Sequence, residues 1–410
     1  MNEIINRLPK METGEELLNK LTVLPDYGED IRTENEAIRL MGLEDIYKIY
    51  LPSTMTKEIY SKLYLATIRS LQKKETKLSV MQQKENFKRI QGMESNGIIG
   101  GSDSFTILGD SGIGKSSAIS KAIDLITGNK VIETERPYSV IIPAFSIQCP
   151  FDCSIKGLLY EVLRKVDEIL DTDYYKSALR ANATTDMLIG SVSQIALNHI
   201  GVLIVDEIQN VVNHRNGNSL VAMLTQLINS SGISICMVGT PESGVFFERI
   251  DYLARRALGL KYTASSYDDY FKSFCTTVFS YQYTKNKTEI NDSYIEWLYE
   301  HSGGILSNVV TLIHDAQELS ILSGREEISF EALRAAYKER MGALHTFIHP
   351  SIIIKAKTPK KPQKSRKLPR KISDIKENLS ILELSKIAKK EDLDIVELLS
   401  EKIIIEEVAI

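Results

Sequence analysis

Few cysteines, no long hydrophobic run and no excess of one charge characterise this chain of 410 residues. Four cysteines are too few for a disulfide framework, so we expect a reducing, cytoplasmic setting. No stretch approaches the 18 apolar residues of a membrane-spanning helix, so we expect no membrane partner. The first ten residues include Glu3 and Arg7 and have no apolar core, which argues against a secretory signal.

The balance of charge conceals an uneven distribution. The formal net charge is −4, from 50 lysines and arginines against 54 acidic residues. Nine basic residues, three prolines and no acidic residue lie between Lys355 and Lys371, which predicts an extended, solvated linker. Residues 372–410 carry −5, and subtracting both segments from the total leaves −8 for residues 1–354. An acidic body is thus followed by a basic linker and an acidic tail.

The acidic tail has apolar residues at helical spacing, such as Ile381, Leu384 and Ile387, and is expected to form short helices. Thirty-nine residues are few for an independent core. We therefore expect the tail either to bind a partner protein or to pack on the body of its own chain.

Apolar strands and helices alternate in the middle of the chain. Strands are predicted at 105–108, 139–145, 202–205 and 233–238, and helices at 116–126, 155–170 and 220–228. Two of these strands are continuous apolar runs, which is typical of strands buried on both faces of a sheet. The pattern predicts an α/β fold with a parallel central sheet flanked by helices. Residues 1–95 are expected to be mainly helical.

A phosphate-binding loop follows the first predicted strand. The sequence matches the pattern G-x-x-x-x-G-K-S and leads directly into a helix. The candidate nucleotide-binding residues are Gly109, Asp110, Ser111, Gly112, Ile113, Gly114, Lys115, Ser116 and Ser117. Glycines let backbone N–H groups turn toward phosphate oxygens, and the helix N-terminus adds a positive dipole. We expect Lys115 to reach the β- and γ-phosphates of ATP, and the Ser116 hydroxyl to bind Mg²⁺.

Two acidic residues end a later strand. The apolar run Val202–Val205 is followed by Asp206 and Glu207. Asp206 would complete the Mg²⁺ site, and Glu207 would orient or deprotonate the attacking water. A base is unnecessary in a protein that only binds nucleotide, so the pair predicts an ATPase.

Three further residues are candidates by their order in the chain. Thr240 follows the next strand and would lie beside Glu207, although a threonine can also simply open a loop. Arg255 and Arg256 follow a helix expected at 244–254. A guanidinium reaching across a subunit interface would stabilise charge during phosphoryl transfer, whereas two arginines on a helix can also be solvated.

The order of these motifs resembles that of the AAA+ ATPases, and several runs look closer to the TnsC/TniB transposition regulators. The runs are the phosphate loop, Cys149-Pro150, the segment 154–159, Asp206–Asn210, Val238–Pro241 and Ala254–Arg256. The resemblance covers residues 51–341. It implies an AAA+ core with a helical lid, Thr240 at the first sensor position, and either Arg255 or Arg256 as the finger. The segment 302–308, where many AAA+ proteins carry a second sensor arginine, has none.

The resemblance also implies a function. Such regulators assemble with ATP into rings or helical filaments on duplex DNA, and link a target-selecting protein to the transposase. Lys156 lies close to the DNA-facing loop of the family, just before a helix expected near Gly157, although a lysine there can also be solvated. The basic linker could contact phosphates without sequence preference or act as a spacer.

The resemblance and the composition together predict five parts. These are a helical N-terminal region at 1–95, an AAA+ P-loop subdomain at 96–262, a helical lid at 263–348, the linker at 349–371 and the helical tail at 372–410. A replication initiator or helicase loader is an alternative within the same chemistry. A nucleotide-switched signalling scaffold that does not bind DNA is an alternative of another class.

The cysteines and histidines predict no further site. Cys149 and Cys153 have no second cysteine or histidine pair, so we expect no zinc site. The histidines at 199, 214, 301 and 314 have no ligand spacing and are expected at the surface or in loops.

Overall fold

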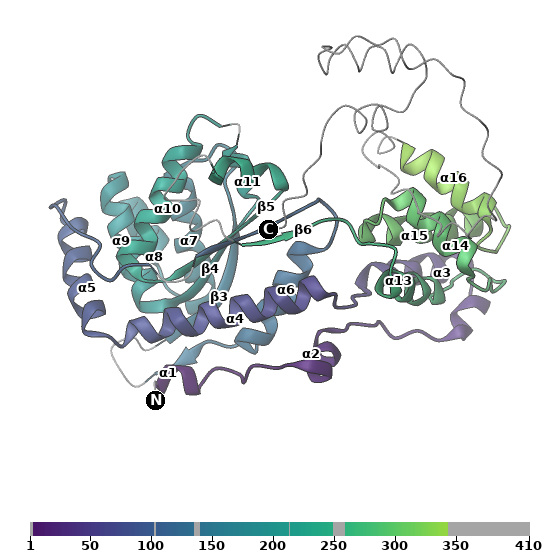
Figure 1. Ribbon diagram of the computed structural model, residues 1–410, viewed down its shortest axis with the longest axis horizontal. Helices are drawn as coiled ribbons and strands as arrows, with labels where there is room; N and C mark the ends of the chain where they lie inside the picture. The colour runs from purple at the N-terminus through teal and green to yellow at the C-terminus, as the bar shows by residue number, and fades with distance from the viewer. Residues whose placement is uncertain (1–2, 102–103, 135–139, 213, 249–258, 343–410) are drawn as a thin grey trace, which may run out of the picture. The chain divides into compact units, whose positions relative to one another are not determined.

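The structure is a computed structural model that describes residues 3–101, 104–134, 140–212, 214–248 and 259–342 (Figure 1). The chain divides into two compact units at 1–353 and 354–410, and all described residues belong to the first. The predicted linker and tail, at 349–371 and 372–410, lie outside the described residues.

A six-stranded sheet forms the centre of the α/β part. Its strand order is β2-β3-β4-β5-β1-β6, and every neighbouring pair is parallel except β2 with β3. The strands are β1 (Phe105–Gly109), β2 (Ile132–Glu133), β3 (Val140–Gln148), β4 (Ile200–Asp206), β5 (Ser234–Gly239) and β6 (Leu260–Tyr262). The predicted sheet is confirmed, with two short edge strands that the sequence did not reveal.

Helices cover both faces of this sheet. Successive side chains of β4 point to opposite faces and pack against different helices. Val202 and Ile204 pack against α2 (Gly14–Leu21), α4 (Thr54–Lys74) and α6 (Lys115–Thr127). Leu203 and Val205 point to the opposite face. That face is covered by α7 (Ile155–Leu170), α9 (Thr185–His199) and α10 (Gly217–Ser231), as Figure 1 shows.

A second core lies in the part of the chain predicted to form the helical lid. It is built by α13 (Asp269–Ser280), α14 (Asp292–Ser302), α15 (Leu306–Leu322) and α16 (Phe330–Arg340). The N-terminal helix α3 (Glu36–Leu43) and the 3-10 helix η2 (Glu44–Lys48) pack on the same core. The residues expected to form one N-terminal region therefore divide between two cores.

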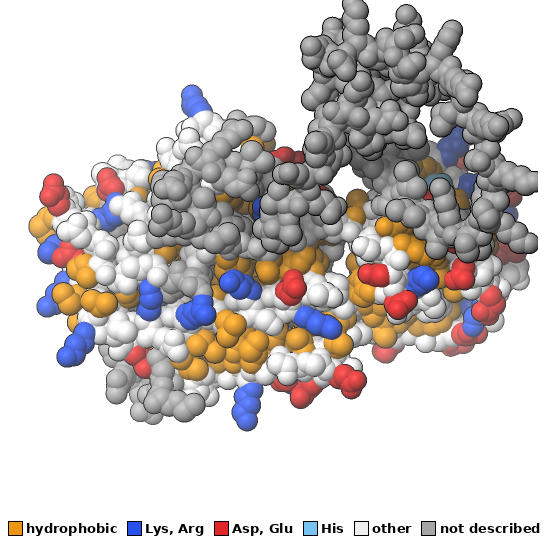
Figure 2. All heavy atoms as spheres, in the orientation of Figure 1, with side chains coloured by type: hydrophobic (Ala, Val, Ile, Leu, Met, Phe, Trp, Pro, Cys, Tyr) orange, Lys and Arg blue, Asp and Glu red, His pale blue; other side chains and the backbone are white. Residues whose placement is uncertain are grey.

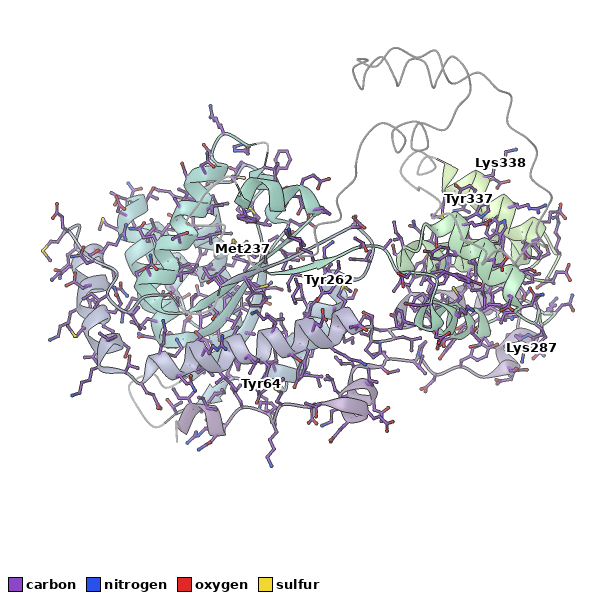
Figure 3. The ribbon with its side chains drawn as sticks, in the orientation of Figure 1. Tyr64, Met237, Tyr262, Lys287, Tyr337 and Lys338 are labelled. Carbon is purple, nitrogen blue, oxygen red and sulfur yellow. The ribbon has the colours of Figure 1, made fainter. Side chains whose placement is uncertain are left out.

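The chain passes between the two cores three times, at 22–26, 51–54 and 263–266. The first two passages are joined by an antiparallel bridge, in which Val23 and Tyr50 exchange backbone hydrogen bonds of 2.9 and 2.8 Å. Tyr262, labelled in Figure 3, ends β6 before the third passage and donates a 2.8 Å hydrogen bond from its hydroxyl to Glu58 of α4. These contacts fix the chain at the points where it crosses.

The remaining elements are short or peripheral. They are α1 (Glu3–Asn6), η1 (Glu29–Thr33), α5 (Lys77–Ile90), α8 (Tyr174–Arg180), η3 (Ile208–Val211) and α11 (Pro241–Glu248). The helix expected at 244–254 begins three residues earlier, because Pro241 has the fixed φ that suits a first helical position. No helix of the described ranges is long and apolar enough to cross a membrane.

Candidate functional site

Three strands bring the predicted nucleotide residues to one edge of the sheet. β1 and β5 are in register with Leu108 opposite Gly239, and β3 and β4 with Gln148 opposite Asp206. Because parallel strands end at the same edge, the phosphate loop, Asp206 and Gly239 meet there. The sheet topology thus produces the arrangement that the motif order predicted.

The phosphate loop has the backbone conformation that its glycines permit. Gly112 and Gly114 have φ of 80° and 93°, in the left-handed region that disfavours residues with a Cβ. Gly114 caps α6, which begins at Lys115. The loop therefore leads into a helix N-terminus, the arrangement that suits a bound phosphate.

Lys115 lies across its own loop. Its Nζ donates to the carbonyls of Gly109 at 2.6 Å and Asp110 at 2.7 Å. Burial lowers the pKa of this ammonium group, while the carboxylates of Asp206, Asp110 and Glu207 oppose that shift. Phosphate oxygens would offer the same group stronger acceptors of opposite charge.

Ser116 and Asp206 form the candidate metal site. The Ser116 hydroxyl donates to Asp206 Oδ2 at 2.9 Å, and Asp206 Oδ1 accepts from the backbone N–H of Glu207 at 2.8 Å. A hydroxyl and a carboxylate beside a phosphate loop are oxygen donors of the kind that Mg²⁺ prefers. The residues present therefore fit Mg²⁺.

Glu207 is exposed at the end of β4 in an uncommon backbone conformation. Its φ is 57°, in the left-handed region, and its carboxylate accepts a hydrogen bond from the Gln209 side chain. Such conformations cost free energy in non-glycine residues and cluster at functional sites. The sequence analysis did not single out Gln209, whose place in the run Asp206–Asn210 was the available signal.

The run Asp206–Asn210 also contacts the Cys149-Pro150 segment. The backbone N–H of Cys149 donates to the Asp206 carbonyl at 2.8 Å, and the Asn210 side chain donates to the Cys149 carbonyl at 3.0 Å. Two runs that carry the family resemblance, about sixty residues apart in sequence, are thus held together in space.

A cavity of about 290 Å³ unites the candidate groups. Its lining includes Lys115, Ser116, Glu207, Thr240 and Ser307. The Thr240 hydroxyl also bonds the carboxylate of Glu242, which lowers the pKa of that acid. The predicted Mg²⁺ ligands, base and first sensor therefore share one space.

The lid reaches this cavity through Ser307. The backbone N–H of Ser307 donates to the Gly112 carbonyl at 3.3 Å, and a Cβ on Gly112 would stand only 2.5 Å from Ser307 Oγ. The segment 302–308, which has no arginine, therefore presents a neutral hydroxyl to the phosphate loop.

A second cavity of about 200 Å³ continues from the phosphate loop between the two cores. It is lined by aromatic and aliphatic side chains, including Tyr47, Ile49, Tyr50, Tyr270, Phe274, Leu306 and Val310. Burial raises the pKa of Tyr50 to about 12, and it raises that of Tyr270 further, so both hydroxyls stay protonated at neutral pH. A flat apolar base fits such a space. This cavity could not be predicted from the sequence, because its walls come from distant parts of the chain.

Lys156 and the two arginines complete the candidate set. α7 begins at Ile155, as in the predicted range 155–170, because the Ser154 side chain caps it, so Lys156 lies in its first turn and not before a helix that starts near Gly157. Its Nζ donates to the Ala183 carbonyl at 3.1 Å, and the residue is exposed. Arg255 and Arg256 lie outside the described residues.

Residues 100–243 match the protein family described as AAA domain. This segment of the chain is similar to an AAA domain. The match spans the phosphate loop, Asp206, Glu207 and Thr240, and the AAA+ P-loop fold expected from the sequence is confirmed. The finer resemblance to the TnsC/TniB regulators is not among the matches and stays a prediction.

Among solved structures, the chain is similar to the Orc1 protein of Aeropyrum pernix in complex with DNA, at 12% identity and a TM-score of 0.43, over 64% of each chain. It is also similar to the Aeropyrum pernix Orc2 protein in its ADPNP–ADP complexes, at 13% identity and a TM-score of 0.39, over 64% of this chain and 66% of that one. The chain thus spans about two thirds of the length of these structures. No curated protein matches it.

Proposed function

We propose that the AAA domain binds ATP with Mg²⁺ and hydrolyses it. The observation that carries this proposal is the shared cavity, in which Lys115, the Ser116–Asp206 pair and Glu207 line one space. A protein that only bound nucleotide would not need a carboxylate in the position of Glu207.

Each side chain then has a distinct part in hydrolysis. Lys115 and the loop N–H groups bind the phosphates, and Glu207 accepts a proton from the attacking water. Ser116 and Asp206 would hold Mg²⁺, whose charge offsets the negative charge that develops on the phosphates. Thr240 would orient the water, and the aromatic cavity beside Gly112 would hold the adenine base.

Hydrolysis and binding can be tested separately. Lys115→Ala should abolish binding of a fluorescent ATP analogue, whereas Glu207→Gln should keep binding and block phosphate release. Lys121→Ala, on the same helix and not lining the cavity, is the matched control and should behave as wild type. Wild-type turnover in Glu207→Gln would show that Glu207 is not the base.

We further propose that ATP binding switches assembly of the protein on duplex DNA, and that the assembly links a target-selecting protein to a transposase. The sequence runs shared with the TnsC/TniB regulators support this proposal. On the face shown in Figure 2, lysine and arginine side chains are spread singly over the α/β part. Because residues 1–354 carry a net charge of −8, a DNA path would be a local basic lining, formed when several copies assemble.

Negative-stain imaging with duplex DNA and a non-hydrolysable ATP analogue tests the assembly and should show rings or filaments. Monomers alone would overturn it. Capture of a transposase subunit by the assembled protein would support the transposition role, whereas capture of a replicative helicase would favour the replication alternative.

Lys156 is the proposed DNA contact in the described part of the chain. Lys156→Ala should weaken binding to all DNA sequences alike and reduce the salt dependence of log K by about one, as expected for one lost phosphate contact. An unchanged salt dependence would remove Lys156 from the DNA path.

A further inference from the structure

The Glu207 carboxylate is held by a neighbouring amide. Gln209, on the 3-10 helix η3, donates from Nε2 to Glu207 Oε2, and both residues line the cavity that contains Lys115 and Ser116. Glu207 is exposed, and an exposed carboxylate without such a contact would rotate freely between cavity and solvent. The contact therefore restricts where the candidate base can point.

The other end of the same amide is buried. Gln209 Oε1 and the hydroxyl of Ser243, on α11, are buried, and neither has a hydrogen-bond partner among the described residues. Both atoms lie within 3.0 Å of the point where a Cβ on Gly239 would stand. The glycine thus leaves the space in which Gln209 and Ser243 approach each other.

These two buried groups are chemically complementary. An amide oxygen accepts and a hydroxyl donates, so a rotation that brought the two within hydrogen-bond distance would satisfy both. Leaving a buried polar atom unpaired is unfavourable, so a hydrogen bond between the two groups would stabilise both. The orientation of the amide is set by its other end, because only the NH₂ group can donate to the Glu207 carboxylate.

We propose that Gln209 is a positioning residue for Glu207, and that the Ser243 hydroxyl braces its amide. The NH₂ group keeps the carboxylate facing the cavity, and the brace ties that orientation to the first turn of α11. The proposal rests on the proposed function, in which Glu207 is the base of ATP hydrolysis.

The first test compares turnover with binding. Gln209→Ala should lower kcat about tenfold or more, since a mispositioned base loses much of the contribution of proton transfer. The Kd for ATP should stay unchanged. In the Glu207→Gln background the same substitution should cause no further loss, because Gln209 acts only through Glu207. An additive loss would indicate structural damage and would overturn the proposal.

The second test perturbs the amide without touching it. Gly239→Ala places a Cβ within 3.0 Å of Gln209 Oε1 and within 2.8 Å of both Ser243 Oγ and the Ile208 side chain, and should lower kcat as Gln209→Ala does. Ser243→Ala should lower kcat by a smaller factor. Ser70→Ala removes another buried hydroxyl without a described partner, on α4, and is the matched control with unchanged kcat.

The outcomes separate the two proposals. If the wild-type protein binds ATP but does not hydrolyse it, the proposed ATPase function fails. A second outcome is that the wild type hydrolyses ATP and Glu207→Gln does not, as the proposed function requires. If Gln209→Ala and Gly239→Ala then both turn over ATP at the wild-type rate, only the positioning role of Gln209 fails. Melting curves monitored by circular dichroism should show that each variant is folded.

Discussion

Lys74 ends α4 with its ammonium group buried in the protein. Its Nζ donates to the carbonyls of Ala196 at 2.9 Å and Leu197 at 2.5 Å, near the C-terminus of α9. Burial lowers the pKa of this lysine from 10.5 to about 7. The group thus ties an N-terminal helix to the opposite face of the sheet, and its protonation is linked to folding.

This link predicts a rise in stability with pH. Between pH 7 and 10.5 the unfolded chain keeps the Lys74 proton more readily than the folded chain, so the free energy of unfolding should increase as pH rises. Urea unfolding from pH 7 to 8.5 should show a contribution of at most about 1.4 kcal/mol per pH unit. Lys74→Met should lose this slope, and parallel pH profiles for the two proteins would contradict the prediction.

Arg39 and Glu326 form a buried ion pair between α3 and the lid. The Arg39 side chain is 1% exposed and donates to the two Glu326 carboxylate oxygens at 2.6 and 2.7 Å. Hydrogen bonds from Arg39 lower the pKa of Glu326. Glu326→Ala would leave a buried guanidinium without its counter-charge, and should lower the free energy of unfolding by about 3–5 kcal/mol.

A matched control for that prediction is the exposed pair of Lys176 and Asp173, joined at 2.9 Å. Asp173→Ala should change stability little, because water already solvates both charges. Denaturant titration of both variants measures the difference. Equal effects would mean that the Arg39–Glu326 pair does not hold α3 to the lid.

At the scale of elements, the contact between the phosphate loop and the lid depends on Gly112. Alanine there would adopt φ of 80° at a cost of about 1–2 kcal/mol and would push against Ser307 Oγ. Gly112→Ala should therefore weaken ATP binding about tenfold or more. Gly92 has a similar φ of 76°, and a Cβ added there would meet open space. Gly92→Ala should therefore lower the free energy of unfolding without affecting ATP binding. Equal ATP affinity in the two variants would exclude the clash.

The aromatic cavity between the two cores gives a prediction about the nucleotide base. Tyr270 lines it and donates from its hydroxyl to the Leu51 carbonyl at 3.0 Å. Tyr270→Ala should weaken ATP binding about tenfold, and binding of inorganic triphosphate should not change, because only ATP carries a base. Competition titrations with the two ligands would distinguish these effects. A parallel loss for both ligands would place the base elsewhere.

Local patterns predicted much of the sheet and of the phosphate site. β4 and β5 contain the continuous apolar runs 202–205 and 235–238, and the phosphate loop needs certain residue types at fixed spacing. Both features can therefore be predicted without knowledge of tertiary contacts. β2 and β6 have two and three residues, too few to show a period. The Tyr270 cavity could not be predicted, because it depends on packing between remote segments.

The position of His314 likewise could not be predicted from the local sequence. His314 was expected at the surface or in a loop, and this was wrong: it lies buried in α15 and contacts Asp315 at 2.9 Å. Nothing in its local spacing indicated that η2 would cover it, where the Tyr47 ring lies tilted by 43° against the His314 ring at 4.7 Å between ring centroids. Burial of a single polar residue is decided by tertiary contacts.

For the whole molecule, the predicted finger arginines can be tested by mixing subunits. Arg255→Ala and Lys115→Ala should each be inactive alone if the finger acts on a neighbouring subunit. Mixed in equal amounts, they should regain about a quarter of the wild-type rate, because one subunit then supplies the loop and its neighbour the finger. The same mixture with Arg256→Ala shows which arginine acts, and no recovery with either would exclude a finger in trans.

The three chain passages between the two cores restrict how they can move. Two passages are bonded together through Val23 and Tyr50 and act as one pivot, and residues 263–266 form the other. A body attached at two pivots keeps one rotational degree of freedom, about the line that joins them. In the proposed ATP-switched assembly, the response of the lid to ATP would therefore be a rotation about that line, and successive subunits would repeat the same angle.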